Sequence, residues 1–395
     1  MKRLDPSLWA GRPGFPKLLA ALHTAEGETR LVGGAVRDLL LGDAVADVDL
    51  ATRLEPQQVV EALTAADIRA VPTGLAHGTI TAVVGGLPYE VTTLRRDVAS
   101  FGRHAEVAFT SDWQEDAARR DFTINALYAH PETLEIADYF GGLADLAAGR
   151  VRFIGDARQR IAEDHLRILR YYRFQTRFGA ALDEEAEDAC AELAHTLKGL
   201  SRERIAAELL ALLALPDPHP TIARMRSRGV LAVILPEACP PQIAALGRLI
   251  EAEAAQGIAP DPVRRLAALL PPMPDVAETV AARLRLSKVQ RGRLVAAAER
   301  RPEDAASPRA LAYRLTPAIA TDRLLLTGGD AGALAGWEAP VFPLKGGAIV
   351  ARGVTAGPAV ARILQSVEAR WVAEGFPEAA WIEAILSEEL ARAAP

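Results

Sequence analysis

Hydrophobic periodicity divides the chain into two parts of different character. In the first part, short apolar runs alternate with glycine-rich turns, which predicts strands and brief helices up to the Gly141-Gly142 pair. From about Asp156 onward, apolar residues recur at helical spacing, and a long helix is predicted over Ile161–Gly179. The pattern therefore predicts an α+β protein whose sheet lies in the N-terminal part and whose remainder is helical.

A double-glycine turn is predicted near the beginning of the mixed part. Gly33 and Gly34 follow a short apolar strand, and a brief helix is expected over Ala35–Leu41. A helix N-terminus without bulky side chains offers backbone N–H groups and the positive end of the helix dipole to phosphate oxygens. The turn is therefore a candidate phosphate site.

Two aspartates follow this predicted helix. Asp47 and Asp49 are two residues apart, so on a strand both carboxylates point to one face while Val48 points to the other. Further along, β-rich runs joined by Gly85-Gly86 predict a hairpin, and Glu90 in its second strand is a candidate third carboxylate. The alternative for Glu90 is a surface glutamate. Carboxylates beside a phosphate-binding turn suggest magnesium and a nucleotide.

Composition restricts the setting of this site. A length of 395 residues predicts two to four domains, and a composition that is 50% hydrophobic and 24% charged is ordinary for a soluble protein. No apolar run reaches the roughly 18 residues of a membrane span, and the N-terminus lacks the apolar core of a signal peptide. Cys190 and Cys239 have neither CxxC spacing nor a histidine cluster nearby, which favours the cytoplasm.

Charge adds one local feature. The net charge of −6 argues against a protein that coats nucleic acid by charge alone. Basic residues are nevertheless concentrated between residues 150 and 178, namely Arg150, Arg152, Arg158, Arg160, Arg167, Arg170, Arg173 and Arg177. A solvated helix face is one interpretation of this cluster, and a surface for phosphates beside the nucleotide site is the other.

Four motifs occur in a fixed order across roughly residues 30–210. They are Gly33-Gly-Ala-Val-Arg-Asp38 with Asp47-Val-Asp49, Arg119-Arg-Asp-Phe-Thr-Ile-Asn-Ala126, Glu163-Asp-His-Leu-Arg-Ile-Leu-Arg170 and Ser201-Arg-Glu-Arg-Ile205. A lone double glycine would be weak evidence, but the ordered set is specific. It resembles the family of bacterial class II tRNA nucleotidyltransferases, or CCA-adding enzymes, which is shared with bacterial poly(A) polymerases.

The resemblance implies a fold and a division into domains. We expect an N-terminal nucleotidyltransferase head of polymerase-β-like type with a small mixed sheet, followed by an all-helical neck, body and tail. The expected bounds are 1–142 for the head, 143–215 for the neck with the nucleotide-selecting motif, 216–300 for the body and 301–395 for the tail, which binds tRNA.

The resemblance also implies an activity. The expected reaction is template-independent addition of CCA to tRNA 3′ ends from CTP and ATP, by two-metal nucleotidyl transfer with release of pyrophosphate. The tRNA acceptor arm and 3′ end would be its partner, with no membrane involved. Alternatives are a poly(A) polymerase or an A-adding enzyme of the same family and, from a different class, a catalytically inactive RNA-binding module on the same fold.

The sequence departs from the family pattern at two places. The segment Arg95–Ser111 is predicted to be a mobile loop, and by resemblance it adapts the site from C to A addition. It carries Phe101-Gly-Arg-His104 where relatives often have an Asp-Gly-Arg-Arg-type segment. The terminal segment 344–364 is predicted to be a helix–loop–helix that resembles the family's tail motif, and it has Ala348 where that motif often has an acid. Neither departure touches the motifs of the core chemistry.

The resemblance assigns roles to twelve residues. Asp47, Asp49 and Glu90 are the expected catalytic residues, and Asp47 and Asp49 are the expected Mg²⁺ ligands. The expected nucleotide-binding residues are Gly33, Gly34, Arg37, Arg120, Asp121, Asn125, Asp164, Arg167 and Arg170. An ordinary structural polar cluster is the alternative for Asp121 and its neighbours.

Base selection can be argued from donors and acceptors. Asp164 and Arg167 are three residues apart, which predicts one face of a helix. Cytosine and adenine both present an amino donor beside a ring-nitrogen acceptor, which a carboxylate and a guanidinium match. Guanine and uracil present the reverse and would leave both charged groups unpaired. The alternative is an exposed salt bridge between the two side chains.

Overall fold

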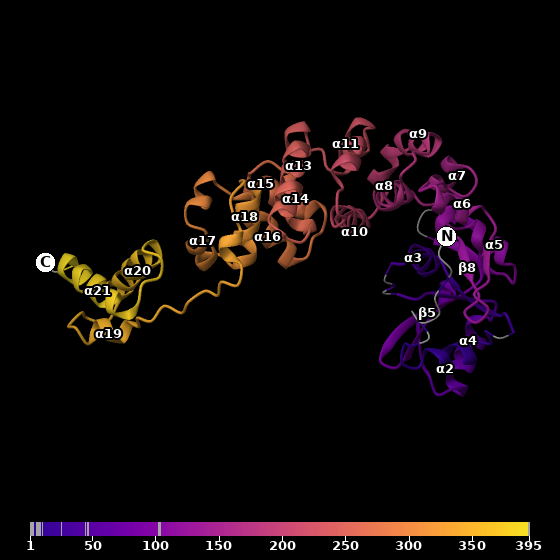
Figure 1. Ribbon diagram of the computed structural model, residues 1–395, viewed down its shortest axis with the longest axis horizontal. Coiled ribbons are helices and arrows are strands. Elements are labelled where there is room, and N and C mark those ends of the chain that lie inside the picture. Colours follow the sequence, from indigo (N-terminus) through magenta and orange to yellow (C-terminus); the bar gives the residue numbers. More distant parts are fainter. Residues whose placement is uncertain are drawn as a thin grey trace. The chain divides into compact units, whose positions relative to one another are not determined.

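The computed structural model describes residue 4, residue 9 and residues 11–24, 26–43, 45, 47–101 and 104–393, without the side chains of residues 97–106 and 393. Two compact units are present. The first comprises Met1–Glu208 with Ser227–Ile234, and the second comprises Leu209–Arg226 with Leu235–Pro395. Each unit is described by itself below (Figure 1).

A seven-stranded mixed sheet forms the centre of the first unit, with the order β3-β4-β5-β2-β1-β8-β9. β2 and β5 are parallel and the other neighbouring pairs are antiparallel. The strands are β1 Thr29–Val32, β2 Leu50–Thr52, β3 Arg69–Gly74, β4 Thr79–Val84, β5 Leu87–Thr93, β8 Leu127–Ala129 and β9 Ile136–Asp138. The predicted small mixed sheet is confirmed.

The predicted hairpin is formed by β4 and β5. Gly85 and Gly86 connect the strands with φ of +59° and +80°, a left-handed geometry that a two-residue hairpin turn requires and that glycine adopts readily. In β5, Tyr89 and Val91 are buried and Glu90 between them is exposed. The alternation predicted for Glu90 is therefore present.

Short helices cover this sheet. α3 packs against β1 and β8, while α4 packs against β3, β4 and β5 and also contacts α2. The helices of the first unit are α2 Phe15–Ala21, α3 Gly34–Leu41, α4 Pro56–Ala65, α5 Trp113–Ala118, α6 Gly142–Ala147, α7 Ala157–Glu163, α8 Arg167–Phe178, α9 Glu184–Glu192 and α12 Val230–Ile234, with 3₁₀ helices η1 Leu75–His77, η2 Thr123–Asn125 and η3 Ala194–Gly199. α10, Arg202–Leu213, begins in this unit.

The prediction of an irregular loop over Arg95–Ser111 is wrong. β6 (Arg95–Phe101) and β7 (His104–Phe109) form a separate two-stranded antiparallel sheet. The register shifts between Asp97 and Ala99, so the period-two alternation that identifies a strand is interrupted. Gly102 and Arg103, which belong to the departure from the family pattern, lie outside the described residues.

The single helix predicted over Ile161–Gly179 is also wrong, because it is two helices. α7 ends at Glu163, and Asp164 is extended, with φ −148° and ψ 104°. The Asp164 carboxylate accepts a hydrogen bond from the N–H of Leu166 at 3.1 Å, a local turn that competes with helix continuation. The apolar stripe continues across the break, since Ile161 and Ile168 are both fully buried.

The second unit is helical, as predicted, and the described residues after β9 form no further strand. Its helices are α11 His219–Ser227, α13 Pro240–Ala255, α14 Pro262–Ala268, α15 Pro274–Arg283, α16 Lys288–Ala298, α17 Pro308–Arg314, α18 Pro317–Leu326, α19 Gly346–Val350, α20 Pro358–Ala373 and α21 Ala379–Ala393, with 3₁₀ helices η4 Pro302–Ala306 and η5 Gly332–Leu334.

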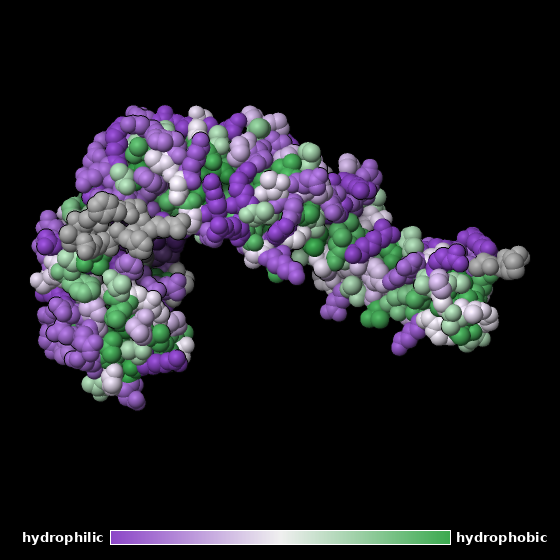
Figure 2. Space-filling view, turned by 180° about the vertical axis from the view of Figure 1, so that it is seen from behind, coloured by the Kyte–Doolittle hydropathy of each residue, from purple (hydrophilic) through white to green (hydrophobic). Residues whose placement is uncertain are grey.

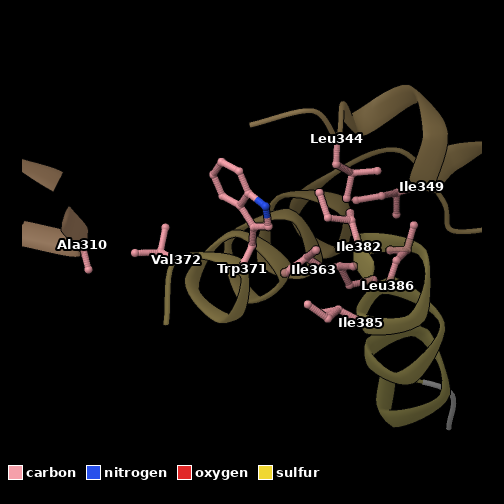
Figure 3. Packing of buried hydrophobic residues seen from close by; sticks show 10 residues of the cluster. Ala310, Leu344, Ile349, Ile363, Trp371, Val372, Ile382, Ile385 and Leu386 are labelled. Atoms are coloured by element: carbon pink, nitrogen blue, oxygen red, sulfur yellow. The ribbon is translucent and has the colours of Figure 1, made fainter. Parts of the chain in front are cut away.

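An apolar cluster holds the C-terminal helices together. Trp371 of α20 lies among side chains of α19 and α21, including Ile349, Ile382 and Leu386 (Figure 3). Its indole N–H donates to the carbonyl of Pro377 at 2.8 Å. The spacing of Ile382, Ile385 and Leu386 is typical of a buried helix face and is the sequence signal for α21, a helix that was not among the predicted elements.

The surface is mixed in character. Figure 2 shows hydrophilic side chains over much of one face, with apolar patches between them. Among the described helices, none combines the length and the apolarity that crossing a membrane requires.

Candidate active site

A cavity of about 430 Å³ in the first unit brings the sequence motifs together. Ten of the twelve predicted site residues line it, and Asp47 and Glu90 do not. The lining consists of Gly33, Gly34, Arg37, Asp49, Arg119, Arg120, Asp121, Asn125, Asp164, Arg167, Arg170, Arg173 and Phe174. Most of these side chains are charged, so the cavity is suited to a charged ligand.

The glycine turn keeps one wall of the cavity open. Gly33 has φ +68° and ψ −126°, a conformation that side chains disfavour, and α3 begins directly after it. A Cβ atom at Gly33 would lie 3.4 Å from Nη1 of Arg120, and one at Gly34 would lie 3.5 Å from Nη2 of Arg37. Two guanidinium groups therefore face the backbone of the turn, which suits phosphate oxygens.

Arg37 is largely buried, and its guanidinium is held in place by hydrogen bonds and by an aromatic ring. Its Nε donates to Asp38 at 2.8 Å, its Nη1 donates to the side-chain oxygen of Asn125, and its guanidinium lies 4.4 Å from the ring centre of Phe178. Burial lowers the pKa of Arg37, and the neighbouring Asp38 opposes that shift. The group stays a fixed cation beside the turn.

The two aspartates lie just before β2 and not within it. The backbone oxygen of Asp49 accepts from the N–H of Val32 at 3.1 Å, which continues the pairing of β2 with β1. Val48 is buried, Asp47 is exposed and Asp49 is half-buried. The predicted division between the two faces is therefore present, although the regular strand begins only at Leu50.

Glu90 lies beside Asp49 on the neighbouring strand. The parallel register pairs Leu50 with Val91, so the residues that precede them are Asp49 and Glu90. Burial raises the pKa of Asp49, the charge of Glu90 raises it further, Arg120 opposes the shift and Asp47 adds to it. Asp49 is thus repelled by both of the other predicted carboxylates.

This repulsion is the feature of the site that fits a metal ion. Negative charge gathers around Asp49 without full compensation by Arg120, and carboxylate oxygens are ligands that hard divalent cations prefer. Within the described part of the chain, however, no three or more His, Cys, Asp or Glu side chains are grouped as a metal site. A cation here would take Asp47 and Asp49 together with oxygens of a bound ligand.

Asp121 joins three parts of the cavity wall. One carboxylate oxygen accepts from Asn125 at 3.1 Å and from the N–H of Phe122 at 2.9 Å, and the other accepts from Arg170 of α8 at 2.6 Å. Burial favours a raised pKa for Asp121, but Arg170 and Asn125 outweigh it, so the pKa lies below its usual value. Asp121 therefore fixes Arg170 and Asn125 in the cavity wall.

Asp164 and Arg167 line the same cavity without contacting each other as an ion pair. Asp164 accepts from Arg204 of α10 at 2.7 Å, whereas Arg167 donates to Glu163 at 2.6 Å and to the carbonyl of Arg119 at 2.9 Å. The predicted shared helix face is wrong, because Asp164 is the extended residue between α7 and α8. The alternative of a salt bridge between Asp164 and Arg167 is wrong as well.

Several residues of the site were not among the twelve that the resemblance assigned, although Arg119 lies in the second motif and Arg173 in the predicted basic cluster. Arg119, Arg173 and Phe174 line the cavity. Arg173 and Phe174 follow Arg170 by three and four residues on α8, a spacing that places them on the same helix face. Arg204 supports Asp164 from the fourth motif, which resembles the helix that supports the nucleotide-selecting motif in the family, although the resemblance named no individual contact.

Family models match two parts of the chain. Residues 29–152 match the model described as the poly A polymerase head domain, and residues 179–240 match the model described as a probable RNA and SrmB-binding site of polymerase A. The mitochondrial CCA tRNA nucleotidyltransferase 1 of Mus musculus is 38% identical over 381 residues, which cover 91% of this chain and 86% of that protein. The CCA-adding enzyme of Anoxybacillus flavithermus is 39% identical over 228 residues, 56% of each chain.

Solved structures give the same result. The Bacillus stearothermophilus CCA-adding enzyme in complex with CTP has a TM-score of 0.73 at 26% identity, covering 96% of this chain and 98% of that one. The Thermotoga maritima CCA-adding enzyme complexed with tRNA has a TM-score of 0.73 at 20% identity, covering 100% of this chain and 99% of that one. The second comparison is a likeness of fold alone.

Proposed function

This chain belongs to the family of CCA-adding tRNA nucleotidyltransferases and related poly(A) polymerases, and we propose that it builds the CCA end of tRNA. It adds C, C and A to tRNA 3′ ends from CTP and ATP without a nucleic-acid template and releases pyrophosphate. The observation that carries the proposal is the cavity in which the glycine turn, Asp49 and the nucleotide-selecting residues Asp164 and Arg167 meet.

The triphosphate occupies the side of the cavity at the glycine turn. Gly33 and Gly34 leave room for its oxygens, and Arg37 and Arg120 neutralise its charge. The proposed catalytic carboxylates are Asp47, Asp49 and Glu90, which serve the attack of the RNA 3′-hydroxyl on the α-phosphate. Of the three, Glu90 is assigned to the attacking hydroxyl. Pyrophosphate leaves along the arginines. The roles of Gly33, Gly34, Arg37, Asp49 and Arg120 are supported by their places in the cavity wall, and those of Asp47 and Glu90 by their closeness to Asp49 and by the sequence motifs.

CCA-adding nucleotidyltransferases are metal-dependent, and Mg²⁺ is the ion we propose, with Asp47 and Asp49 as its ligands in this chain. When bound there, Mg²⁺ would activate the attacking hydroxyl and balance the negative charge of the triphosphate. The mutual repulsion around Asp49 supports this assignment, because a cation would relieve it.

Base choice rests on Asp164 and Arg167. Each is already bonded within the protein, Asp164 to Arg204 and Arg167 to Glu163. A cytosine or adenine edge can add its amino donor to the carboxylate and its ring-nitrogen acceptor to the guanidinium. A uracil or guanine edge would place like groups against each of them, which costs several kcal/mol in a buried site.

The helical remainder is proposed to hold tRNA, and we retain the expected head, neck, body and tail at 1–142, 143–215, 216–300 and 301–395. A second cavity, of about 610 Å³, supports an RNA-binding tail. Arg352, Arg362 and Arg392 line it together with Ser366 and Glu389. Arg352 pairs with Glu383 and Arg392 with Glu389, so phosphate oxygens would compete with these carboxylates for the arginines. The free thiols of Cys190 and Cys239 agree with the proposed cytoplasmic location.

The test uses the purified full chain and tRNA transcripts that lack CCA, CA or A. CTP and ATP are supplied singly and together, and the products are sequenced. Completion of CCA on all three transcripts, and arrest after CC without ATP, is the expected result. A-tails formed without CTP would indicate a poly(A) polymerase, and addition to the CC transcript alone would indicate an A-adding enzyme. Binding of tRNA without any incorporation would indicate an inactive RNA-binding module.

A further inference from the structure

Asp116 is a buried carboxylate that belongs to none of the four motifs. It lies on α5, and the residue is 1% exposed. Four donors surround it. One oxygen accepts from Nε of Arg119 at 2.8 Å and from the N–H of Arg95 at 3.2 Å, and the other accepts from Nη2 of Arg120 at 3.0 Å and from the hydroxyl of Tyr128 at 2.6 Å.

Two of these donors belong to residues that line the nucleotide cavity. Arg119 and Arg120 both line it. The guanidinium of Arg120 is hydrogen-bonded along one edge only, since Nη2 donates to Asp116 and Nε donates to Tyr128 at 3.1 Å. Its remaining nitrogen, Nη1, lies toward the glycine turn, 3.4 Å from where a Cβ of Gly33 would be. Asp116 therefore determines the direction in which Arg120 presents its free N–H groups.

A third donor comes from the hairpin β6–β7. Arg95 is the first residue of β6, and its backbone N–H ends on the same carboxylate. At the same end of the hairpin, directly after β7, the N–H of Thr110 donates to the carbonyl of Leu94 at 3.0 Å. The base of the hairpin and the cavity arginine thus share one anchor, so a displacement of either one disturbs the hydrogen bonds of the other.

We infer that Asp116 is a positioning residue for nucleotide binding, which holds Arg120 toward the glycine turn and joins it to the base of the β6–β7 hairpin. This inference rests on the proposed function for the role of Arg120. The alternative is that Asp116 only stabilises the fold, as buried ion-paired carboxylates commonly do.

The test measures CTP binding to the full-length protein by calorimetry in the absence of tRNA. Asp116→Asn keeps the shape of the side chain but places an amide where Arg120 and Tyr128 donate, and we expect CTP affinity to fall about tenfold to a hundredfold. In an Arg120→Ala background the same substitution should change the affinity less than about twofold, because the group through which Asp116 acts is gone. Equal losses in both backgrounds would overturn the inference.

A matched control separates positioning from stability. Asp322, in the second unit, is 0% exposed and accepts from Arg293 at 2.6 and 2.8 Å. Asp322→Asn should lower thermal stability, as Asp116→Asn does, but leave CTP affinity unchanged. If Asp116→Asn lowers stability alone and CTP binds as before, Asp116 is structural and the inference fails.

Hydrogen exchange tests the link to the hairpin independently. CTP should change the exchange rate of the Arg95 amide in the wild-type protein, and this response should be absent in Asp116→Asn. An unchanged response in the variant would remove the hairpin from the inference. If the protein binds CTP but adds no nucleotide to tRNA, the proposed function fails and these binding measurements keep their meaning.

Discussion

Each unit contains a group of arginines bonded to carboxylates, and the two groups differ in what surrounds them. In the second unit, Glu253 accepts from Arg264 at 2.7 Å and from Arg265 at 2.8 Å, and these residues are 1–3% exposed. In the first unit, the side chains of Arg120, Arg167 and Arg170 are 20%, 11% and 31% exposed and border a cavity. The same residue types are sealed in one unit and open to a ligand in the other.

The two groups differ in how many arginine N–H donors are already used in hydrogen bonds within the protein. Arg265 also donates to the carbonyls of Leu213 at 2.8 Å and of Pro216 at 3.1 Å, so its donors are used within the protein. Arg120 keeps a nitrogen that faces the glycine turn. A sealed group contributes to the free energy of unfolding, whereas an open group contributes to binding, and substitutions in each should separate the two effects.

The largest effect is expected at Asp49, which lines the same cavity as the open group. Asp49→Ala should reduce nucleotide incorporation into tRNA by more than about a thousandfold, because a proposed metal ligand is lost. Thermal stability should be unchanged or slightly higher, since burial and the neighbouring Glu90 raise the pKa of Asp49 and its charge is unfavourable in the fold. Glu61→Ala, at an exposed carboxylate of α4, is the control and should retain activity. Near-normal incorporation by Asp49→Ala would contradict the proposed site.

The sealed group should show the opposite behaviour. Glu253→Gln leaves Arg264 and Arg265 buried without their shared counter-charge, and we expect it to lower the free energy of unfolding by about 3–5 kcal/mol. Urea unfolding measures this change, and calorimetry should show unaltered CTP affinity. A variant that keeps its stability, or one that loses CTP binding while folded, would break the distinction between the two groups.

Local rules predicted much of the fold. The Gly85-Gly86 hairpin, the turn before α3 and the helical character of the second unit follow from turn chemistry and apolar spacing. The hairpin β6–β7 was missed because its register shift interrupts the alternation. The break at Asp164 was missed because a side-chain hydrogen bond competes with a continuous apolar stripe.

The candidate site was predicted in its residues and not in its contacts. The motifs identified ten residues of the cavity wall. Asp164, however, bonds to Arg204, which lies 40 residues further along the chain, and nothing in the spacing indicates that pair. The burial of a side chain also depends on residues that are distant in the sequence. Arg264 and Arg265 resemble any basic pair in the sequence, and only packing makes one such pair sealed and another open.

A smaller effect is expected in the pH dependence of stability at Asp116, the buried carboxylate that accepts a hydrogen bond from Arg120 of the open group. Burial alone would raise its pKa, but Arg120, Arg119 and Tyr128 together hold the pKa well below its usual value. A depressed pKa contributes stability above the unfolded value of about 3.9, and that stability is lost as pH falls through the folded value. Asp116→Asn should therefore be about 2 kcal/mol less stable than the wild type at pH 7, with the gap narrowing below about pH 5.

Urea unfolding at several pH values between 7 and 3.5 measures this gap. We expect the difference in free energy of unfolding to be constant down to about pH 5 and to shrink at lower pH. At lower pH the unfolded wild type becomes protonated at Asp116, so both unfolded proteins carry a neutral side chain there. A gap that widens on acidification would have the wrong sign and would contradict the ion pairing of Asp116.

The smallest effect concerns the fidelity of the open group. Arg204 holds one oxygen of Asp164 at 2.7 Å, and Arg204→Met removes both this bond and its charge. The carboxylate is then free to turn away from the position in which it opposes the uracil carbonyl. We expect the preference for CTP over UTP, as a ratio of kcat/KM values, to fall about tenfold, while overall stability changes little because both side chains are partly exposed. Arg202→Met is the matched control on the same helix, since the structure gives Arg202 no ion pair with any residue that it describes. If the ratio stays the same in both variants, the Arg204 contact is a surface salt bridge, and Asp164 selects the base without support from α10.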